Sequence, residues 1–243
     1  MRLLTLFTAL LLSTPLAANC DLDLQNSNRS EADKKRDAVS LPCDMAALIK
    51  LNKGDVVLDL LGGGGYFSEL LSLQVGPQGR VYLHNNKAYL PYVETQLTAR
   101  LQGNRLPNVQ RLDAELERLQ LHPASLDAVY FIMGYHDMYH VSDGWKIDPT
   151  QLMTQIYSAL KPGGQMLVVD HNAPAGSGVK DAQELHRIEA NYVEKELQQF
   201  GFELIQSSDV LKNSSDDYSK SVFDAAVRGK TDRFVLVVKK PEV

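Results

Sequence analysis

Histidine and aspartate side chains gather at two places in the second half of the chain. One is the segment GYHDMYH and the other is DHN, and each directly follows an apolar stretch. Imidazole titrates near neutral pH, so a histidine here can accept a proton from a hydroxyl or amine while an aspartate orients the ring. The predicted catalytic residues are His136, Asp137, Asp170 and His171.

A glycine-rich turn follows the first apolar stretch of the domain, in the sequence DLLGGGGYF at residues 59–67. Glycine permits unusual backbone angles and lets a ligand approach the amide groups at the start of a helix. The predicted cofactor-binding residues of this turn are Asp59, Gly62, Gly63 and Gly65. Glycine-rich turns also hold the pyrophosphate of dinucleotides, so a nucleotide-dependent oxidoreductase is one alternative.

The elements that must position these residues alternate between strand and helix patterns. Apolar, β-branched stretches predict strands at residues 55–60, 80–83, 109–112, 126–133, 165–170, 202–207 and 234–239. Helices are predicted at residues 44–51, 66–73, 90–101, 149–160 and 182–200. This alternation predicts an α/β fold with a Rossmann-like, doubly wound sheet of seven strands and helices on both faces. The sheet should be mostly parallel with an antiparallel last strand, because an extended connection joins the last two strands.

The carboxyl ends of parallel strands meet at one edge of such a sheet, and ligands bind in the crevice there. We therefore expect the glycine turn and both histidine-containing segments to open onto the same crevice.

Composition limits the classes of partner. With 243 residues, of which 44% are hydrophobic, the chain can bury a proper core. Its formal net charge is −5 and it has no basic block, which argues against nucleic acid. Its N-terminal apolar run is too short for a stable membrane span. The expected partner is a small-molecule acceptor.

The N-terminus has the pattern of an export signal: one basic residue, an apolar run and two alanines before the cleavage point. We predict a signal peptide at residues 1–18, a polar leader at 19–43 that is either solvated or a partly ordered arm, and a single domain at 44–243. The protein should then be periplasmic or secreted. Cys20 raises a lipid anchor as an alternative. Cys20 and Cys43 either form a disulfide in an oxidising compartment or remain two thiols.

Five segments resemble class I S-adenosylmethionine-dependent methyltransferases, and in particular an exported group of uncharacterised predicted methyltransferases. They are VVLDLLGGGGYFSELL, GYHDMY, LKPGGQMLVVDH, HRIEANYV and KSVFDAAVRGKTDRFVL, and they cover most of residues 45–240. The resemblance implies S-adenosylmethionine as the cofactor. It also implies methyl transfer to an oxygen or nitrogen of a small or medium acceptor.

The resemblance assigns cofactor contacts to the ends of three strands. In the family the first strand and turn read D-x-G-x-G-x-G, which Asp59, Gly63 and Gly65 fit, whereas Leu61 stands at the first glycine. The second strand normally ends in an acid that binds the ribose hydroxyls, and here that contact falls to Asn85. Asp113 follows the third strand, where such folds contact the adenine amine, or it caps a helix.

The resemblance also raises metal binding, because metal-dependent catechol O-methyltransferases draw acidic and amide ligands from equivalent strand ends. Asp137, Asp170 and Asn172 are candidates of that kind, although a histidine-rich set suits a transition metal better than magnesium. The sequence specifies no metal. A second function is therefore an exported, non-catalytic metal- or ligand-binding protein on the same scaffold. The late connection at 209–232 is either a cover over the acceptor pocket or surface decoration.

Overall fold

The structure, a computed structural model, describes residues 22–242. The signal peptide predicted at residues 1–18 and Cys20 lie outside the described residues. Cys43 is disulfide-bonded. Within residues 22–242, no helix combines the length and the apolar content needed to cross a membrane.

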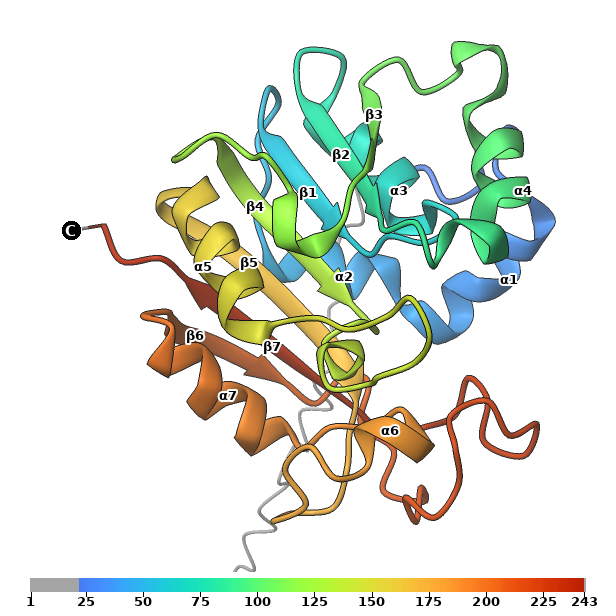
Figure 1. Ribbon diagram of the computed structural model, residues 1–243. Coiled ribbons are helices and arrows are strands. Elements are labelled where there is room, and N and C mark those ends of the chain that lie inside the picture. The colour runs from blue at the N-terminus through green and yellow to red at the C-terminus, as the bar shows by residue number, and fades with distance from the viewer. Residues whose placement is uncertain (1–21, 243) are drawn as a thin grey trace, which may run out of the picture.

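Seven strands form one sheet in the order β3-β2-β1-β4-β5-β7-β6 (Figure 1). Neighbours from β3 to β5 pair in parallel, whereas β7 runs antiparallel to both β5 and β6. The strands are β1 (Val56–Leu60), β2 (Arg80–Asn85), β3 (Val109–Asp113), β4 (Leu126–Ile132), β5 (Leu160–His171), β6 (Glu203–Ser208) and β7 (Arg233–Lys239). The predicted Rossmann-like sheet with an antiparallel last strand is confirmed. Chain order reverses at β1, between β2 and β4, which places the expected crevice at the end of β1.

Helices cover both faces of the sheet. They are α1 (Glu31–Ser40), α2 (Pro42–Leu48), α3 (Tyr66–Val75), α4 (Leu90–Leu101), α5 (Pro149–Ala159), α6 (Ala182–Leu185) and α7 (Ala190–Gln199). Apolar side chains of α5 and α7, such as Ile156 and Leu197, pack on one face of the sheet. Those of α2 and α3, such as Met45 and Leu71, pack on the other face. Each such buried side chain contributes about 1.5–3 kcal/mol, so the two faces together hold the strand ends in place.

The single helix predicted over residues 182–200 is wrong, because the chain leaves α6 at His186 and begins α7 at Ala190. His186 has a left-handed backbone, with φ 54° and ψ 47°, which ends α6. Arg187 then turns inward, and its fully buried guanidinium pairs with Asp216 at 2.8 Å. Periodicity could not reveal this break, since a carboxylate distant in the sequence holds the arginine.

The polar segment expected to be solvated contains helix α1, which docks on the domain. Ser30 caps α1, its Oγ accepting the backbone N–H of Asp33. The Asp33 carboxylate pairs with Arg100 of α4 at 2.8 Å, and Arg29 pairs with Asp37 at 2.7 Å. The charges that suggested a solvated arm are therefore used in ion pairs, and they hold α1 beside the turn that follows β1.

Candidate active site

The turn after β1 has the backbone of a ligand-binding loop. Gly63 and Gly65 have φ of 59° and 79°, which glycine adopts without strain. Leu61, at the place of the first glycine, also has a positive φ of 53°. A left-handed backbone costs a leucine roughly 1–2 kcal/mol, and such strain persists only where the surrounding structure imposes it. Leu61 therefore has a backbone conformation that a glycine at this place would adopt without strain.

Asp59, near the end of β1, lies under this turn and is 2% exposed. Its Oδ2 accepts a hydrogen bond from the Ser68 hydroxyl at 2.6 Å. The same oxygen lies 2.6 Å from the point that a Cβ would occupy at Gly62, so the turn needs a glycine there. Burial raises the pKa of Asp59 to about 6, because the carboxylate loses its water.

Two residues at the end of β2 hold the turn by hydrogen bonds. The buried His84 ring accepts the Leu61 N–H at Nδ1 (3.3 Å) and donates from Nε2 to the Ala114 carbonyl (3.0 Å). Burial lowers the pKa of His84 to about 4, so this ring is neutral at pH 7. Asn85 bonds Gly63 twice: its Oδ1 accepts the Gly63 N–H at 3.0 Å, and its Nδ2 donates to the Gly63 carbonyl at 2.9 Å. The predicted ribose contact would require Asn85 to exchange these bonds.

Asp113, the predicted adenine contact, ends β3 directly beside Asn85 of β2. Its side chain pairs with Arg111 at 2.8 Å and remains 35% exposed. A ligand can therefore still reach this carboxylate, although part of its charge is offset.

Helix α1 brings a cation over the turn that sequence analysis missed. The Arg36 guanidinium lies 4.2 Å from the centre of the Tyr66 ring, and the Tyr66 hydroxyl donates to Asp37 at 2.6 Å. Arg36 is exposed, yet desolvation by the protein atoms around it lowers its pKa. Burial raises the pKa of Tyr89, the charge of Asp137 raises it further and the charge of Arg36 opposes both. The Tyr89 ring lies 6.1 Å from the Trp145 ring, whose Nε1 donates to the Asp137 carbonyl at 2.9 Å, so Tyr89 links the turn to the segment after β4.

The carboxyl ends of β4 and β5 bring His136, Asp137 and Asp170 together. His136 opens a short 3-10 turn (His136–Met138) after β4, and Asp170 lies at the end of β5. The buried Asp170 carboxylate accepts two hydrogen bonds from His136, one from ring Nδ1 at 2.8 Å and one from the backbone N–H at 2.9 Å. The other ring nitrogen, Nε2, lies 3.2 Å from Asp137 Oδ1. Parallel strands thus join a histidine and an orienting carboxylate that are 34 residues apart.

Two carboxylates hold a proton on His136. Burial alone would lower the pKa of His136, but the charges of Asp170 and Asp137 outweigh it and raise the pKa to about 10. For Asp137, burial would raise the pKa, but hydrogen bonds from His136 and His186 lower it. In the protein alone, the His136 ring is therefore an imidazolium at pH 7.

His186 is a further member of this cluster that sequence analysis missed. Its Nδ1 lies 3.3 Å from His136 Nε2 and 3.7 Å from Asp137 Oδ1. The residue falls in HRIEANYV, one of the segments that carries the family resemblance. The helix predicted over residues 182–200 did not place its side chain in the crevice, whereas the break between α6 and α7 does.

His171 lies at the border of the cluster, with its ring centre 6.2 Å from that of His136. Its Nδ1 is 2.7 Å from the Thr231 hydroxyl. Burial lowers the pKa of His171 to about 4, against the opposing charge of Asp170, so this imidazole is neutral at pH 7.

The acidic and amide metal ligands considered from the sequence are not assembled. Asn172 turns away, its Nδ2 donating to Asp232 at 2.9 Å and its Oδ1 accepting the backbone N–H of Ala190. Asp170 lies behind His136 rather than beside Asp137. The atoms that converge belong instead to His136, Asp137 and His186.

The late connection at 209–232 runs beside α6 (Figure 1). Its Phe223 ring lies 4.7 Å from the His186 ring, and Thr231 contacts His171. Phe223 nevertheless remains 57% exposed. This connection therefore borders the histidine cluster and leaves an apolar ring at its edge.

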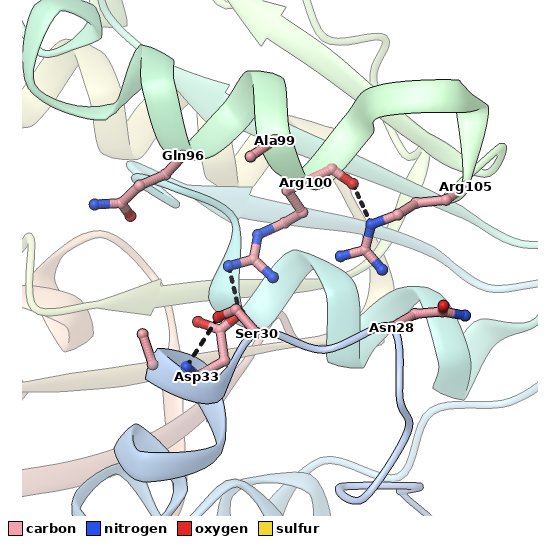
Figure 2. Close-up of a pocket in the computed structure, with 8 residues that line it drawn as sticks. Asn28, Ser30, Asp33, Gln96, Ala99, Arg100 and Arg105 are labelled. Carbon is pink, nitrogen blue, oxygen red and sulfur yellow. Dashed lines mark hydrogen bonds and ion pairs between the residues drawn. The ribbon is translucent and has the colours of Figure 1, made fainter.

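A hollow of about 420 Å³ lies between α1 and α4, adjacent to the glycine turn (Figure 2). Arg100 and Arg105 line it: Arg100 donates to Asp33 and, from Nε, to the Gly64 carbonyl, and Arg105 donates to the Arg100 carbonyl. Glu69 pairs with both arginines. These paired charges join α1 to the turn, so the hollow belongs to the support of the turn. The predicted catalytic side chains lie outside it.

Residues 58–168 match the methyltransferase domain family, a range that runs from β1 to the later part of β5. The chain is 28% identical over 138 residues to the ubiquinone/menaquinone biosynthesis C-methyltransferase UbiE of Hahella chejuensis, covering 56% of this chain and 51% of that protein. It is 28% identical over 123 residues to the malonyl-[acyl-carrier protein] O-methyltransferase of a Marinomonas species, covering 51% and 40%. The alignments thus span about half the length of these curated relatives.

Solved structures share the fold at lower sequence identity. A methyltransferase from Aquifex aeolicus, described as S-adenosylmethionine-dependent, superposes with a TM-score of 0.61 at 18% identity, covering 84% of this chain and 92% of that one. The [4+2]-cyclase SpnF superposes with a TM-score of 0.62 at 17% identity, covering 89% and 86%. These similarities support a class I methyltransferase domain that uses S-adenosylmethionine as its cofactor. The example of SpnF shows that this fold does not by itself fix the reaction.

Proposed function

We propose that this class I methyltransferase domain transfers the methyl group of S-adenosylmethionine to an oxygen or nitrogen of a small or medium acceptor. The observation that carries the proposal is that Tyr89, next to the glycine turn where the cofactor would bind, packs on Trp145, which donates to the Asp137 carbonyl beside His136. The cofactor supplies an already activated methyl group, so the protein must chiefly align the acceptor and accept a proton.

The residues around the turn fit this cofactor. A Cβ added to Gly63 would lie 3.7 Å from the Tyr89 ring, in van der Waals contact, so glycine keeps the backbone of the turn accessible beside Tyr89. Arg36 offers a guanidinium suited to the carboxylate of the cofactor. Asn85 is the departure from the family pattern, since it replaces an acid by an amide already bonded to Gly63. We therefore expect weaker binding of the ribose than an acid would give.

Two histidines border the acceptor end of the crevice in different protonation states. His136 already carries a proton and is held by Asp170, so its proposed role is to bind the acceptor next to Asp137. His171 is neutral at pH 7 and is the proposed proton acceptor. Asp170 acts through His136 as a positioning residue.

A transfer assay with methyl-labelled cofactor tests this proposal. The assay offers the protein a panel of phenols, catechols, carboxylic acids and primary amines. We expect at least one acceptor to gain label, and His171→Ala to lower kcat without weakening cofactor binding. If the protein binds the cofactor but labels no oxygen or nitrogen acceptor, the transfer proposal fails. If His171→Ala turns over as fast as the wild type, His171 is not the proton acceptor.

We also propose that the protein is exported, as part of the exported group that its sequence resembles. The support is the N-terminal pattern of a basic residue, an apolar run and small residues. Mass spectrometry of the protein from a periplasmic or secreted fraction should find a chain that begins at residue 19. A protein that is found only in the cytosol with residues 1–18 attached would contradict export.

The second candidate function is an exported, non-catalytic ligand-binding protein on the same scaffold. It is favoured by Asn85, whose amide is committed to Gly63 where catalytic relatives of the fold carry an acid. This function predicts that the histidine cluster binds its ligand equally well with and without S-adenosylmethionine. Labelled product in the transfer assay would exclude it.

A further inference from the structure

Three potential ligand atoms in the histidine cluster are spaced as they would be around one metal ion. His136 Nε2 lies 3.2 Å from Asp137 Oδ1 and 3.3 Å from His186 Nδ1, and the last two atoms are 3.7 Å apart. Zinc bonds to nitrogen and oxygen are about 2.0–2.2 Å long, so a tetrahedral ion keeps two ligand atoms roughly 3.3–3.6 Å apart. The three observed separations, from 3.2 to 3.7 Å, lie within about 0.1 Å of this range, so small side-chain shifts would suffice to bind an ion.

The arrangement behind His136 is that of a metal-binding histidine. The Asp170 carboxylate, which is fully buried, accepts the Nδ1–H of His136 at 2.8 Å and so fixes the ring and its tautomer. This leaves Nε2 to face the cluster. A carboxylate behind the second ring nitrogen is the usual support of a histidine that binds zinc.

Burial and charge also suit a dication. The side chains of His136, Asp137 and His186 are 5%, 24% and 19% exposed, so the site is enclosed but keeps an open side. Asp137 places one carboxylate at the site, and the Asp170 carboxylate lies behind His136. Two imidazoles with a carboxylate form a ligand set for a transition metal rather than for magnesium.

The fold, and not a mobile surface loop, places the third ligand. His186 adopts its left-handed backbone at the end of α6, and the next residue, Arg187, is fixed by its buried pair with Asp216. The position of His186 is therefore determined by the same contact that interrupts the helix.

We propose that His136, Asp137 and His186 bind one divalent transition-metal ion, with zinc as the best fit, and that Asp170 positions His136 for it. Three protein ligands leave a fourth position for water or an acceptor oxygen, as in catalytic zinc sites. Binding of the ion displaces the proton from His136 Nε2 and does not depend on methyl transfer. Presentation of an acceptor by the ion rests on the proposed function.

Calorimetric titration with zinc chloride tests the site in the full chain, after the protein has been dialysed against a chelator. We expect one ion per chain with submicromolar affinity. His186→Ala, at a partly exposed position, should lose more than about 100-fold in affinity, and Asp170→Asn about 10–100-fold. The control is His122→Ala, which removes an exposed imidazole outside the cluster and should bind as the wild type does.

The outcome is independent of cofactor binding and of transfer, because zinc alone is the ligand. Thermal unfolding without metal establishes that each variant is folded, and Asp137→Asn replaces His186→Ala if the latter is not. No zinc binding by the wild type would overturn the proposal. Wild-type affinity in folded His186→Ala or Asp137→Asn would overturn it as well.

Discussion

Replacement of Asp59 by asparagine should stabilise the protein without cofactor. The asparagine would keep the size of the side chain and could still accept the Ser68 hydroxyl, but it would place no charge under the glycine turn. Asp59 is 2% exposed and burial raises its pKa from 3.8 to about 6. The ionised carboxylate is therefore unfavourable in the folded state.

The size of the effect follows from the shift in pKa. Between pH 3.8 and about 6 the folded protein binds more protons at Asp59 than the unfolded chain does, so stability is lost as pH rises through this window. A shift of about 2.2 units corresponds to about 3 kcal/mol. Relative to the wild type, Asp59→Asn should therefore gain about 2.4 kcal/mol between pH 4 and pH 8, because the unfolded carboxyl is already partly ionised at pH 4.

Urea unfolding of the wild type and Asp59→Asn at several pH values between 4 and 8 measures this difference. The comparison isolates Asp59, since every other titrating group is common to both proteins. Asp143→Asn, at an exposed position, is the control and should not change the pH dependence. A difference between wild type and Asp59→Asn that stays constant across this range would refute the reasoning.

Three further predictions concern stability and are checked by the same unfolding measurements. The buried His84 has a lowered pKa, so the unfolded chain binds more protons than the folded protein between pH 4 and 6.5. The wild type should therefore lose up to about 3 kcal/mol of stability at this residue as pH falls through that window. If the difference in stability between the wild type and His84→Asn is the same at pH 7 and pH 4, this prediction is wrong. Gly62→Ala should destabilise by about 1–3 kcal/mol, because its Cβ would lie 2.6 Å from Asp59 Oδ2; unchanged stability would mean that the carboxylate moves freely. Arg187→Met should lower the free energy of unfolding by about 3–5 kcal/mol, because it leaves Asp216 buried without its partner. A second substitution, Asp216→Leu, should restore part of this stability. Equal stability of the single and double variants would contradict the pairing.

The sheet could be predicted from the sequence because its strands are continuous apolar stretches with turns between them. The glycine turn was found for the same local reason, since β1, the turn and α3 follow each other directly in the chain. The convergence of His136 and Asp170 also followed, because parallel strands end at the same edge whatever separates them in sequence.

Ion pairs between residues distant in the sequence determine the features that the sequence could not predict. The break that directs His186 into the cluster depends on the pairing of Arg187 with Asp216, which no local pattern reveals. Likewise, the polar segment before the domain folds as α1 because Asp33 forms an ion pair with Arg100 of α4. Its composition alone was equally compatible with a solvated arm.

The departures from the family pattern also needed the structure for their interpretation. Leu61 takes a left-handed backbone at the place of the first glycine, a conformation that glycine also adopts. Asn85 is committed to Gly63, so this substitution changes what the end of β2 can offer to a ribose. The first departure is compatible with cofactor binding, and the second should weaken it.

Calorimetric titration of S-adenosylmethionine into the wild type, Gly63→Val and Gly103→Val tests the central claim most directly. Both glycines have a left-handed backbone, with φ of 59° and 65°, so valine strains both turns alike. A Cβ at Gly63 would approach Tyr89, whereas at Gly103 it would meet no described residue within 4 Å. The account predicts one-to-one, micromolar binding by the wild type and Gly103→Val, and its loss in folded Gly63→Val. Absence of binding in the wild type, or equal binding by all three proteins, would contradict it.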